Sequence, residues 1–133
     1  MIQKIHHMSI AVRSLEDALR FYRDTLGLTV HKHATQEDQG VKAALLTIGG
    51  SEIELLEPLG PDTPVGRFLE RRGEGLHHIC LQTDDIDKEL ADLKAKGVEL
   101  IDQEPRQGLA GRICFLHPRS TNGVLVELAQ PLE

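Results

Sequence analysis

The chain has 133 residues, a length typical of one domain, and its formal net charge of −6 opposes general attraction to nucleic acid or to anionic membranes. No apolar run approaches the roughly 18 residues of a membrane span. The first residues lack the apolar core of a secretory signal, which predicts a soluble, cytoplasmic protein. In that compartment Cys80 and Cys114 are expected to be reduced and buried.

The sequence contains an internal repeat. Residues 5–30 and residues 76–100 each begin with a strand-like run that includes two adjacent histidines and continue into a helix that ends at a glycine. The first helix is expected to start after the cap Ser14, and the second after Asp85 or Asp84. The apolar stripe of the first helix is expected to consist of Leu15, Ala18, Leu19, Tyr22 and Leu26, and Gly27 ends that helix. The apolar positions of the second helix include Ile86, Leu90 and Leu93, and Gly97 ends it.

Each copy of the repeat closes on a short strand after its helix, and two further strand-like runs follow that strand. They cover residues 42–48 and 52–59 in the first half and residues 112–117 and 124–132 in the second half. Turn signals separate them, at Gly49-Gly50 and at Asn122-Gly123.

Between the halves, Thr63 and Pro64 predict a short helix that ends at Gly73. The chain is therefore expected to be one α+β domain, residues 1–133, made of two tandem βαβββ modules. Module 1 covers about 4–60, the linker helix about 63–73 and module 2 about 74–133. The paired modules should form a curved mixed sheet around a cleft.

Four polar residues stand out at equivalent positions of the repeat. Side chains alternate along a strand, so His7 faces away from the row of Met8 and Ile10, and His78 repeats that pattern in the second half. Glu54 and Glu127 alternate with apolar neighbours on the closing strand of each half. A single strand histidine is usually structural and a single strand glutamate usually solvated. Their joint recurrence predicts one shared metal site, His7, Glu54, His78 and Glu127.

Two imidazoles and two carboxylates suit a borderline or hard divalent ion, such as Co²⁺, Ni²⁺, Mn²⁺, Fe²⁺ or Zn²⁺. On an octahedral ion, four protein ligands leave two positions for water or a bidentate substrate, which permits Lewis-acid catalysis. The other histidines are expected to have different roles. His6 and His77 should pack against neighbouring elements, whereas surface or loop positions are expected for His31, His33 and His117.

The motifs HHMSIAV, QGVKAALL, EIELLEPL, GEGLHHICLQTDDI and FLHPRSTNGVLVEL together resemble the methylmalonyl-CoA epimerase family of the vicinal oxygen chelate superfamily, over nearly the whole chain. The resemblance implies paired βαβββ modules, a homodimer, an acyl-coenzyme A substrate and a divalent metal, with Co²⁺ first. It carries ligand roles onto His7, His78 and Glu127. The remaining ligand position falls on Glu54, where some epimerases have glutamine.

The implied reaction interconverts (R)- and (S)-methylmalonyl-CoA by removing and returning the proton at the α-carbon through a metal-stabilised enolate. Glu127 is the first candidate for one base. A second glutamate proposed for the family would fall at Ala43, which cannot transfer a proton, so Glu54 is the next candidate, with Gln39 or a bound water assisting.

Contacts to the coenzyme A phosphates could come from scattered arginines, although such residues are usually solvated or ion-paired. The candidates are Arg71, Arg72, Arg106, Arg112 and Arg119.

Three other functions use related scaffolds. A glyoxalase I-type lactoylglutathione lyase, or another metal-dependent isomerase of the superfamily, would use the same ligands, so only the motif combination favours the epimerase. An extradiol dioxygenase would bind Fe²⁺ through two histidines and one glutamate, and Glu54 as a fourth ligand argues against it. A metal-free binding module would need none of the four residues.

Overall fold

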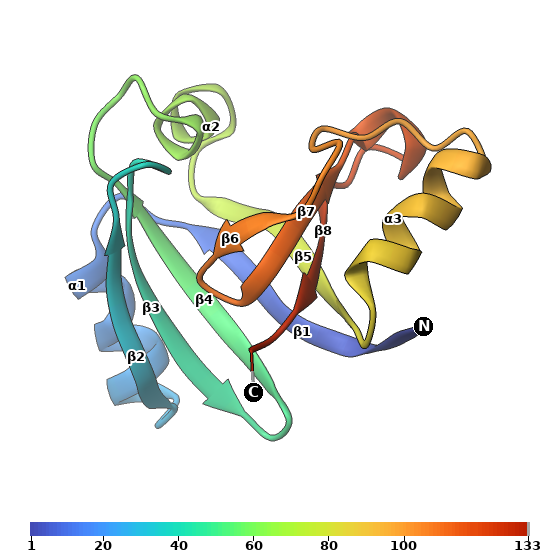
Figure 1. Cartoon of the computed structure of the whole chain (residues 1–133). Helices are drawn as coiled ribbons and strands as arrows, with labels where there is room; N and C mark the ends of the chain where they lie inside the picture. The colour runs from blue at the N-terminus through green and yellow to red at the C-terminus, as the bar shows by residue number, and fades with distance from the viewer. Residues whose placement is uncertain (133) are drawn as a thin grey trace. The chain divides into compact units, whose positions relative to one another are not determined.

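The computed structural model describes residues 1–132, and the fold is α+β, as the sequence predicts. Two compact units form, one from His7–His77 and one from Met1–His6 together with the segment that starts at His78. In chain order, a strand, a helix and three strands occur twice. The first set is β1, α1, β2, β3 and β4, and the second is β5, α3, β6, β7 and β8 (Figure 1).

The unit His7–His77 has the strand order β2-β3-β4-β1. Its strands are β1 (Ile2–Ala11), β2 (Thr29–Gln36), β3 (Val41–Ile48) and β4 (Ser51–Pro58). β1 runs parallel to β4, whereas β3 is antiparallel to both β2 and β4. One sheet face packs on α1 (Leu15–Leu19), and the buried residues of this core are Val12, Leu15, Leu19, Ala44, Leu46 and Leu55.

The first helix begins as predicted, because the Ser14 side chain accepts a hydrogen bond from the backbone N–H of Asp17. After Leu19 it continues as a π-helix, η1 (Arg20–Thr25). A π-helix has a wider turn than an α-helix, so the apolar stripe changes direction there. Tyr22 still packs on the core, but Leu26 is 54% exposed, and the prediction that it belongs to the buried stripe is wrong.

The linker helix is α2 (Pro64–Arg72), which matches the prediction. The Thr63 hydroxyl caps its start by accepting from the N–H of Gly66 at 3.0 Å. Gly73 follows its last residue with φ of +76°, a backbone conformation that favours glycine.

The second unit has the strand order β1-β5-β8-β7-β6, to which β1 contributes its first residues. The other strands are β5 (Gly75–Thr83), β6 (Arg106–Gly108), β7 (Gly111–Leu116) and β8 (Val126–Gln130), and the three-residue helix η2 (Pro118–Ser120) lies between β7 and β8. β5 runs parallel to β8, just as β1 runs parallel to β4. The repeat read from the sequence is therefore a repeat of topology.

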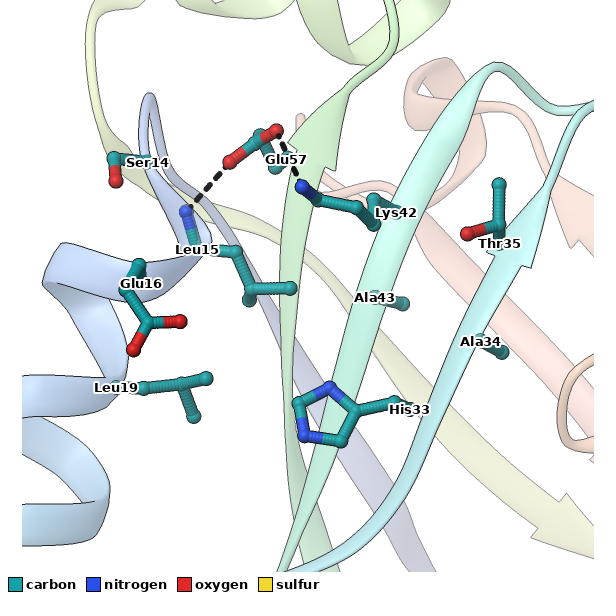
Figure 2. Close-up of a pocket in the computed structure, with 10 residues that line it drawn as sticks. All are labelled: Ser14, Leu15, Glu16, Leu19, His33, Ala34, Thr35, Lys42, Ala43 and Glu57. Atoms are coloured by element: carbon teal, nitrogen blue, oxygen red, sulfur yellow. Dashed lines mark hydrogen bonds and ion pairs between the residues drawn. The ribbon is translucent and has the colours of Figure 1, made fainter.

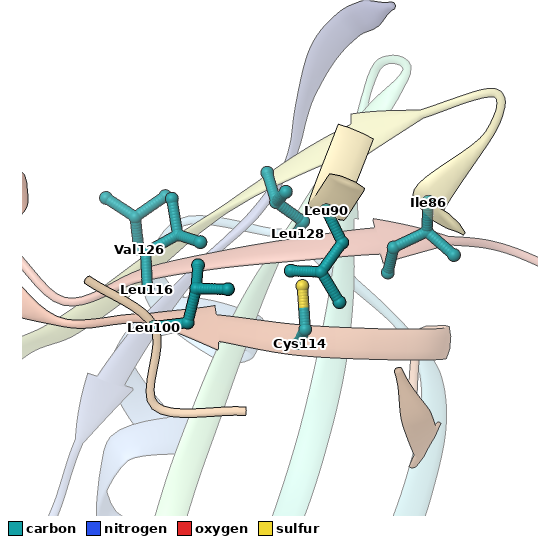
Figure 3. Packing of buried hydrophobic residues seen from close by; sticks show 7 residues of the cluster. All are labelled: Ile86, Leu90, Leu100, Cys114, Leu116, Val126 and Leu128. Atoms are coloured by element: carbon teal, nitrogen blue, oxygen red, sulfur yellow. The ribbon is translucent and has the colours of Figure 1, made fainter. Parts of the chain in front are cut away.

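The helix of this unit, α3 (Ile86–Ala95), is capped by Asp85, which accepts from the N–H of Lys88 at 3.1 Å. Its apolar side meets β7 and β8 (Figure 3). The cluster consists of Ile86, Leu90, Leu100, Cys114, Leu116, Val126 and Leu128, with Leu93 partly buried against it. Within residues 1–132, no helix combines the length and the apolar composition that crossing a membrane would require.

Cys114 lies inside this cluster as a free, fully buried thiol. Burial raises the pKa of the Cys114 thiol to about 12 from its ordinary value of 9.0, and the nearby Asp102 carboxylate adds to the shift. The folded protein therefore keeps the thiol proton at a pH where the unfolded chain loses it. The stability that this provides is fully present below the unfolded value and is lost as pH rises through the folded value.

We expect the free energy of unfolding to fall between about pH 9 and pH 12, and Cys114→Val to make this fall shallower, because the variant removes the titrating group while keeping an apolar side chain of similar size. Urea denaturation of both proteins at several pH values in this range measures the two slopes. Equal slopes would contradict the assignment.

Candidate metal centre

His7 and Glu54 lie on neighbouring strands of the unit His7–His77. The parallel register of β1 and β4 sets Ser9 beside Glu54, and His7 lies two residues earlier on the same face of β1. Both side chains are nearly inaccessible, with 2% of His7 and 4% of Glu54 exposed. Nε2 of His7 lies 3.5 Å from Oε1 of Glu54. The first pair of predicted ligands is thus brought together.

The face that carries His7 is the more buried face of this part of β1. His7, Ser9 and Ala11 are all buried, whereas Met8 on the opposite face is 40% exposed. Alternation along the strand was predicted, but the polar row is better shielded from water than the apolar row at Met8. Shielding strengthens the electrostatic interactions of a carboxylate and an imidazole on that face.

His78 and Glu127 form the corresponding pair in the second unit. The parallel register of β5 and β8 sets Cys80 beside Glu127, and His78 lies two residues before Cys80. Each of the two ligand candidates is 5% exposed, and Nε2 of His78 lies 3.0 Å from Oε1 of Glu127. The Phe115 ring packs edge-on against the His78 ring at 5.3 Å between centroids, which fixes the orientation of the imidazole.

Each pair fits two adjacent ligand positions on one divalent ion. With metal–ligand bonds of about 2.1 Å, neighbouring ligand atoms lie roughly 3.0 Å apart on an octahedral ion and roughly 3.4 Å apart on a tetrahedral one. The measured separations are 3.0 Å for His78 and Glu127 and 3.5 Å for His7 and Glu54. Imidazole nitrogen and carboxylate oxygen are also suitable donors. The His and Glu residues of this chain could therefore hold a divalent metal.

The candidates for a second base are arranged differently. Ala43 is buried on β3 and pairs in register with Leu56 of β4, two residues after Glu54. A side chain at position 43 therefore lies on the same face of the sheet as Glu54. Gln39 lies in the turn between β2 and β3, where its backbone N–H donates to the Gln36 carbonyl at 3.2 Å. The methyl side chain of Ala43 cannot transfer a proton, so position 43 supplies no base.

An open hollow of about 600 Å³ lies on the α1 side of the first unit, between the start of that helix and strands β2 and β3 (Figure 2). At its edge Glu57 accepts a hydrogen bond from the backbone N–H of Leu15 at 2.7 Å and pairs with Nζ of Lys42 at 3.4 Å. His33 and Thr35 also line it. Neither His7 nor Glu54 is among the lining residues, so this hollow is separate from the first ligand pair.

The remaining histidines have structural contacts. The His77 ring packs on Phe68 of α2 at 4.9 Å between centroids, which confirms its predicted packing role. His117 caps η2 by accepting from the N–H of Arg119 at 3.1 Å, in the turn that the sequence predicts. His31 and His33 are exposed, which confirms their predicted surface position, although they lie on strand β2 and not in a loop. His31 contacts the Glu52 carboxylate at 2.7 Å.

Three of the five arginines considered for phosphate contacts are ion-paired at the surface. Arg112 makes two hydrogen bonds to Asp87, Arg106 pairs with Asp102, and Arg119 pairs with Glu99. The Arg112 guanidinium keeps the pKa of the Asp87 carboxyl below its ordinary value, through a direct hydrogen bond between exposed groups. Arg72 instead lies over the Phe68 ring at 5.7 Å.

Sequence reasoning missed the partners that hold the ligands. Ser9 donates a hydrogen bond to Glu54, and Phe115 packs on His78. Alternation along β1 already placed Ser9 on the His7 face. Alternation along β7 likewise sets Ile113 and Phe115 on one face, but only the register of β7 and β8 makes Phe115 the neighbour of Glu127. The chemical contacts themselves depend on strand pairing.

Known proteins are similar to this chain in sequence and in fold. Residues 6–115 match the Glyoxalase/Bleomycin resistance protein/Dioxygenase superfamily. An ethylmalonyl-CoA/methylmalonyl-CoA epimerase of Cereibacter sphaeroides is 41% identical, with 98% of this chain and 99% of that protein covered. The human mitochondrial methylmalonyl-CoA epimerase is 39% identical, with 96% of this chain and 73% of that protein covered.

Among solved structures, a Streptomyces coelicolor methylmalonyl-CoA epimerase in complex with 2-nitronate-propionyl-CoA superposes with a TM-score of 0.96 at 41% identity, covering 100% of both chains. A resemblance of this extent, in sequence and in structure, includes both halves of the repeat. The chain belongs to the Glyoxalase/Bleomycin resistance protein/Dioxygenase superfamily and, within it, to the methylmalonyl-CoA epimerase family.

Proposed function

We propose that the protein epimerises methylmalonyl-CoA, interconverting the (R) and (S) forms, with one divalent ion held jointly by His7, Glu54, His78 and Glu127. The observation that carries the proposal is the repeated pair of a histidine Nε2 and a glutamate Oε1, at 3.5 Å in one unit and 3.0 Å in the other. Family membership supplies the reaction and the acyl-coenzyme A substrate. The chain's own geometry supplies the donor atoms.

The difficulty of the reaction is the weak acidity of the α-carbon, whose proton must leave as negative charge develops on the thioester. A divalent ion bound by the four residues would act as a Lewis acid toward the thioester and carboxylate oxygens of the substrate. The protein's part is to hold the four donors in fixed positions. The near-complete burial of all four side chains serves that purpose by keeping water from competing with them.

Glu127 is assigned as the first proton-transfer base. Its Oε1 lies beside Nε2 of His78, and a carboxylate has a second oxygen with which to reach a substrate proton. The edge-on contact of Phe115 with His78 limits movement of the imidazole. The Glu127 carboxylate therefore lies beside an imidazole of defined orientation. Glu127 can thereby take part in binding and still be placed for proton transfer.

Return of the proton from the opposite face needs a second group. Ala43 cannot supply it, so we assign this role to Glu54, with Gln39 or an ordered water as the accessory.

The superfamily also contains glyoxalases and dioxygenases, but the epimerase relatives match over nearly the full chain. Because glyoxalases belong to the same superfamily, a lactoylglutathione lyase activity is the second candidate. The homodimer implied by the resemblance and the cytoplasmic location predicted from the sequence stay predictions.

The first test is hydrogen exchange at the substrate α-carbon. Protein loaded with Co²⁺ should exchange the α-proton of methylmalonyl-CoA for solvent deuterium, observed by mass spectrometry. Glu127→Gln should slow the exchange by about a hundredfold or more, because it removes a base while keeping the side-chain shape. Ethylmalonyl-CoA is the second substrate to assay, since the Cereibacter relative is named for both.

The matched control for this variant is Glu104→Gln, which makes the same chemical change on an exposed residue. It should exchange at the wild-type rate. Exchange by the wild type no faster than without protein, combined with turnover of a glutathione hemithioacetal, would replace the epimerase by the lyase.

The second test is the number of ions bound. If the four residues hold a single ion, calorimetric titration with Co²⁺ should give one ion per chain, and Glu54→Leu or His78→Ala, which each remove a donor atom, should each weaken that same event by at least about tenfold. Two ions per chain, with each variant removing only one of them, would mean that the two pairs bind separately. No binding by wild type would favour the metal-free binding module.

A further inference from the structure

Ser9 stands directly beside Glu54. The register of β1 and β4 makes the two residues neighbours across the strands, and Ser9 is completely buried. Its hydroxyl oxygen lies 2.5 Å from Oε1 of Glu54. This separation falls at the short end of the range for a hydroxyl donating to an ionised carboxylate, about 2.5–2.7 Å. A hydroxyl has one proton to donate, and here that proton points at a proposed ligand oxygen.

The same oxygen faces the histidine. Oε1 of Glu54 accepts from Ser9 and lies 3.5 Å from Nε2 of His7. A glutamate side chain has three rotatable bonds, and ordering it costs conformational entropy. A hydrogen bond that holds the carboxylate in place before any ion binds would offset part of that cost. A carboxylate oxygen has lone pairs enough to accept from Ser9 and still coordinate an ion.

The second half of the chain offers a natural comparison. Cys80 occupies the position equivalent to Ser9, two residues after His78 and beside Glu127 in the register. A thiol is a much weaker hydrogen-bond donor than a hydroxyl. In that half the carboxylate lies closer to the imidazole, at 3.0 Å rather than 3.5 Å. The two pairs therefore share a backbone arrangement but differ in the group beside the carboxylate.

We propose that Ser9 is a positioning residue that holds the Glu54 carboxylate, through its Oε1, in the orientation required for binding a divalent cation together with His7. The inference rests on the proposed ligand role of Glu54. It assigns Ser9 no contact with substrate. It makes the first pair dependent on a hydroxyl, whereas Cys80 takes the same place in the second pair.

The test is a double-mutant cycle read by Co²⁺ affinity in calorimetry. Ser9→Ala should weaken Co²⁺ binding by about tenfold to a hundredfold, the usual effect of removing a group that orients a ligand. In the Glu54→Leu background, the same serine change should weaken binding by less than about twofold, because leucine has no oxygen for the Ser9 hydroxyl to orient. The visible absorption of bound Co²⁺, which depends on ligand number and geometry, should also change in Ser9→Ala.

Ser14→Ala is the matched control. It removes another serine hydroxyl of the same unit, one that caps α1 and therefore contributes to stability without touching either ligand. It should lower the unfolding midpoint in urea while leaving Co²⁺ affinity and the Co²⁺ spectrum at their wild-type values. A loss of affinity in Ser14→Ala equal to that in Ser9→Ala would mean that stability alone sets metal binding, and the inference would be overturned.

The remaining outcomes separate this inference from the proposed function. Wild-type affinity in Ser9→Ala together with weakened binding in Glu54→Leu would remove the role of Ser9 and leave the ligand set intact. Equal weakening by Ser9→Ala in both backgrounds would show an effect through the fold and would also overturn it. Unchanged affinity in Glu54→Leu would remove Glu54 from the ligand set, and the inference about Ser9 would fall with it.

Discussion

The parallel pairing of the first strand with the last strand of each half is the constraint on which the site depends. It joins β1 to β4 and β5 to β8, and in each case the residue two positions after the histidine becomes the neighbour of the glutamate. A parallel register fixes which side chains share a face, and a slip of one residue would send the glutamate to the opposite face. One backbone arrangement, used twice, thereby produces two imidazole–carboxylate pairs.

Burial makes these pairs chemically consequential. An ionised carboxylate removed from water is costly unless hydrogen bonds or an opposite charge compensate it. Glu54 and Glu127 are each at least nine-tenths buried, and each has a histidine nitrogen within 3.5 Å. The proposed cation would complete that compensation. The apolar clusters of α1 and α3 lie on the other face of their sheets, where they stabilise the fold without occupying the ligand face.

The halves have diverged within this shared plan. β2 has eight residues whereas its counterpart β6 has three, and a π-helix extends the first helix but not the second. Ser9 and Cys80 differ in donor strength at equivalent positions, and Phe115 packs on the histidine of the second half. Such differences give the two carboxylates distinct surroundings, which is compatible with unequal duties in a reaction that removes a proton from one face and returns it to the other.

Sequence alone was sufficient for the repeat, the helix caps, the glycine stops and the four ligand candidates, because each follows from local periodicity or from recurrence along the chain. Ser14, Asp85 and Thr63 cap the helices as predicted, since a cap needs only residues a few positions apart. The prediction that Leu26 belongs to the buried stripe was wrong, because the shift from an α-helix to a π-helix depends on how the turn packs rather than on residue type. The short contact of Ser9 with Glu54 was decided only by tertiary structure: 45 residues separate the two, and strand pairing alone brings them to 2.5 Å.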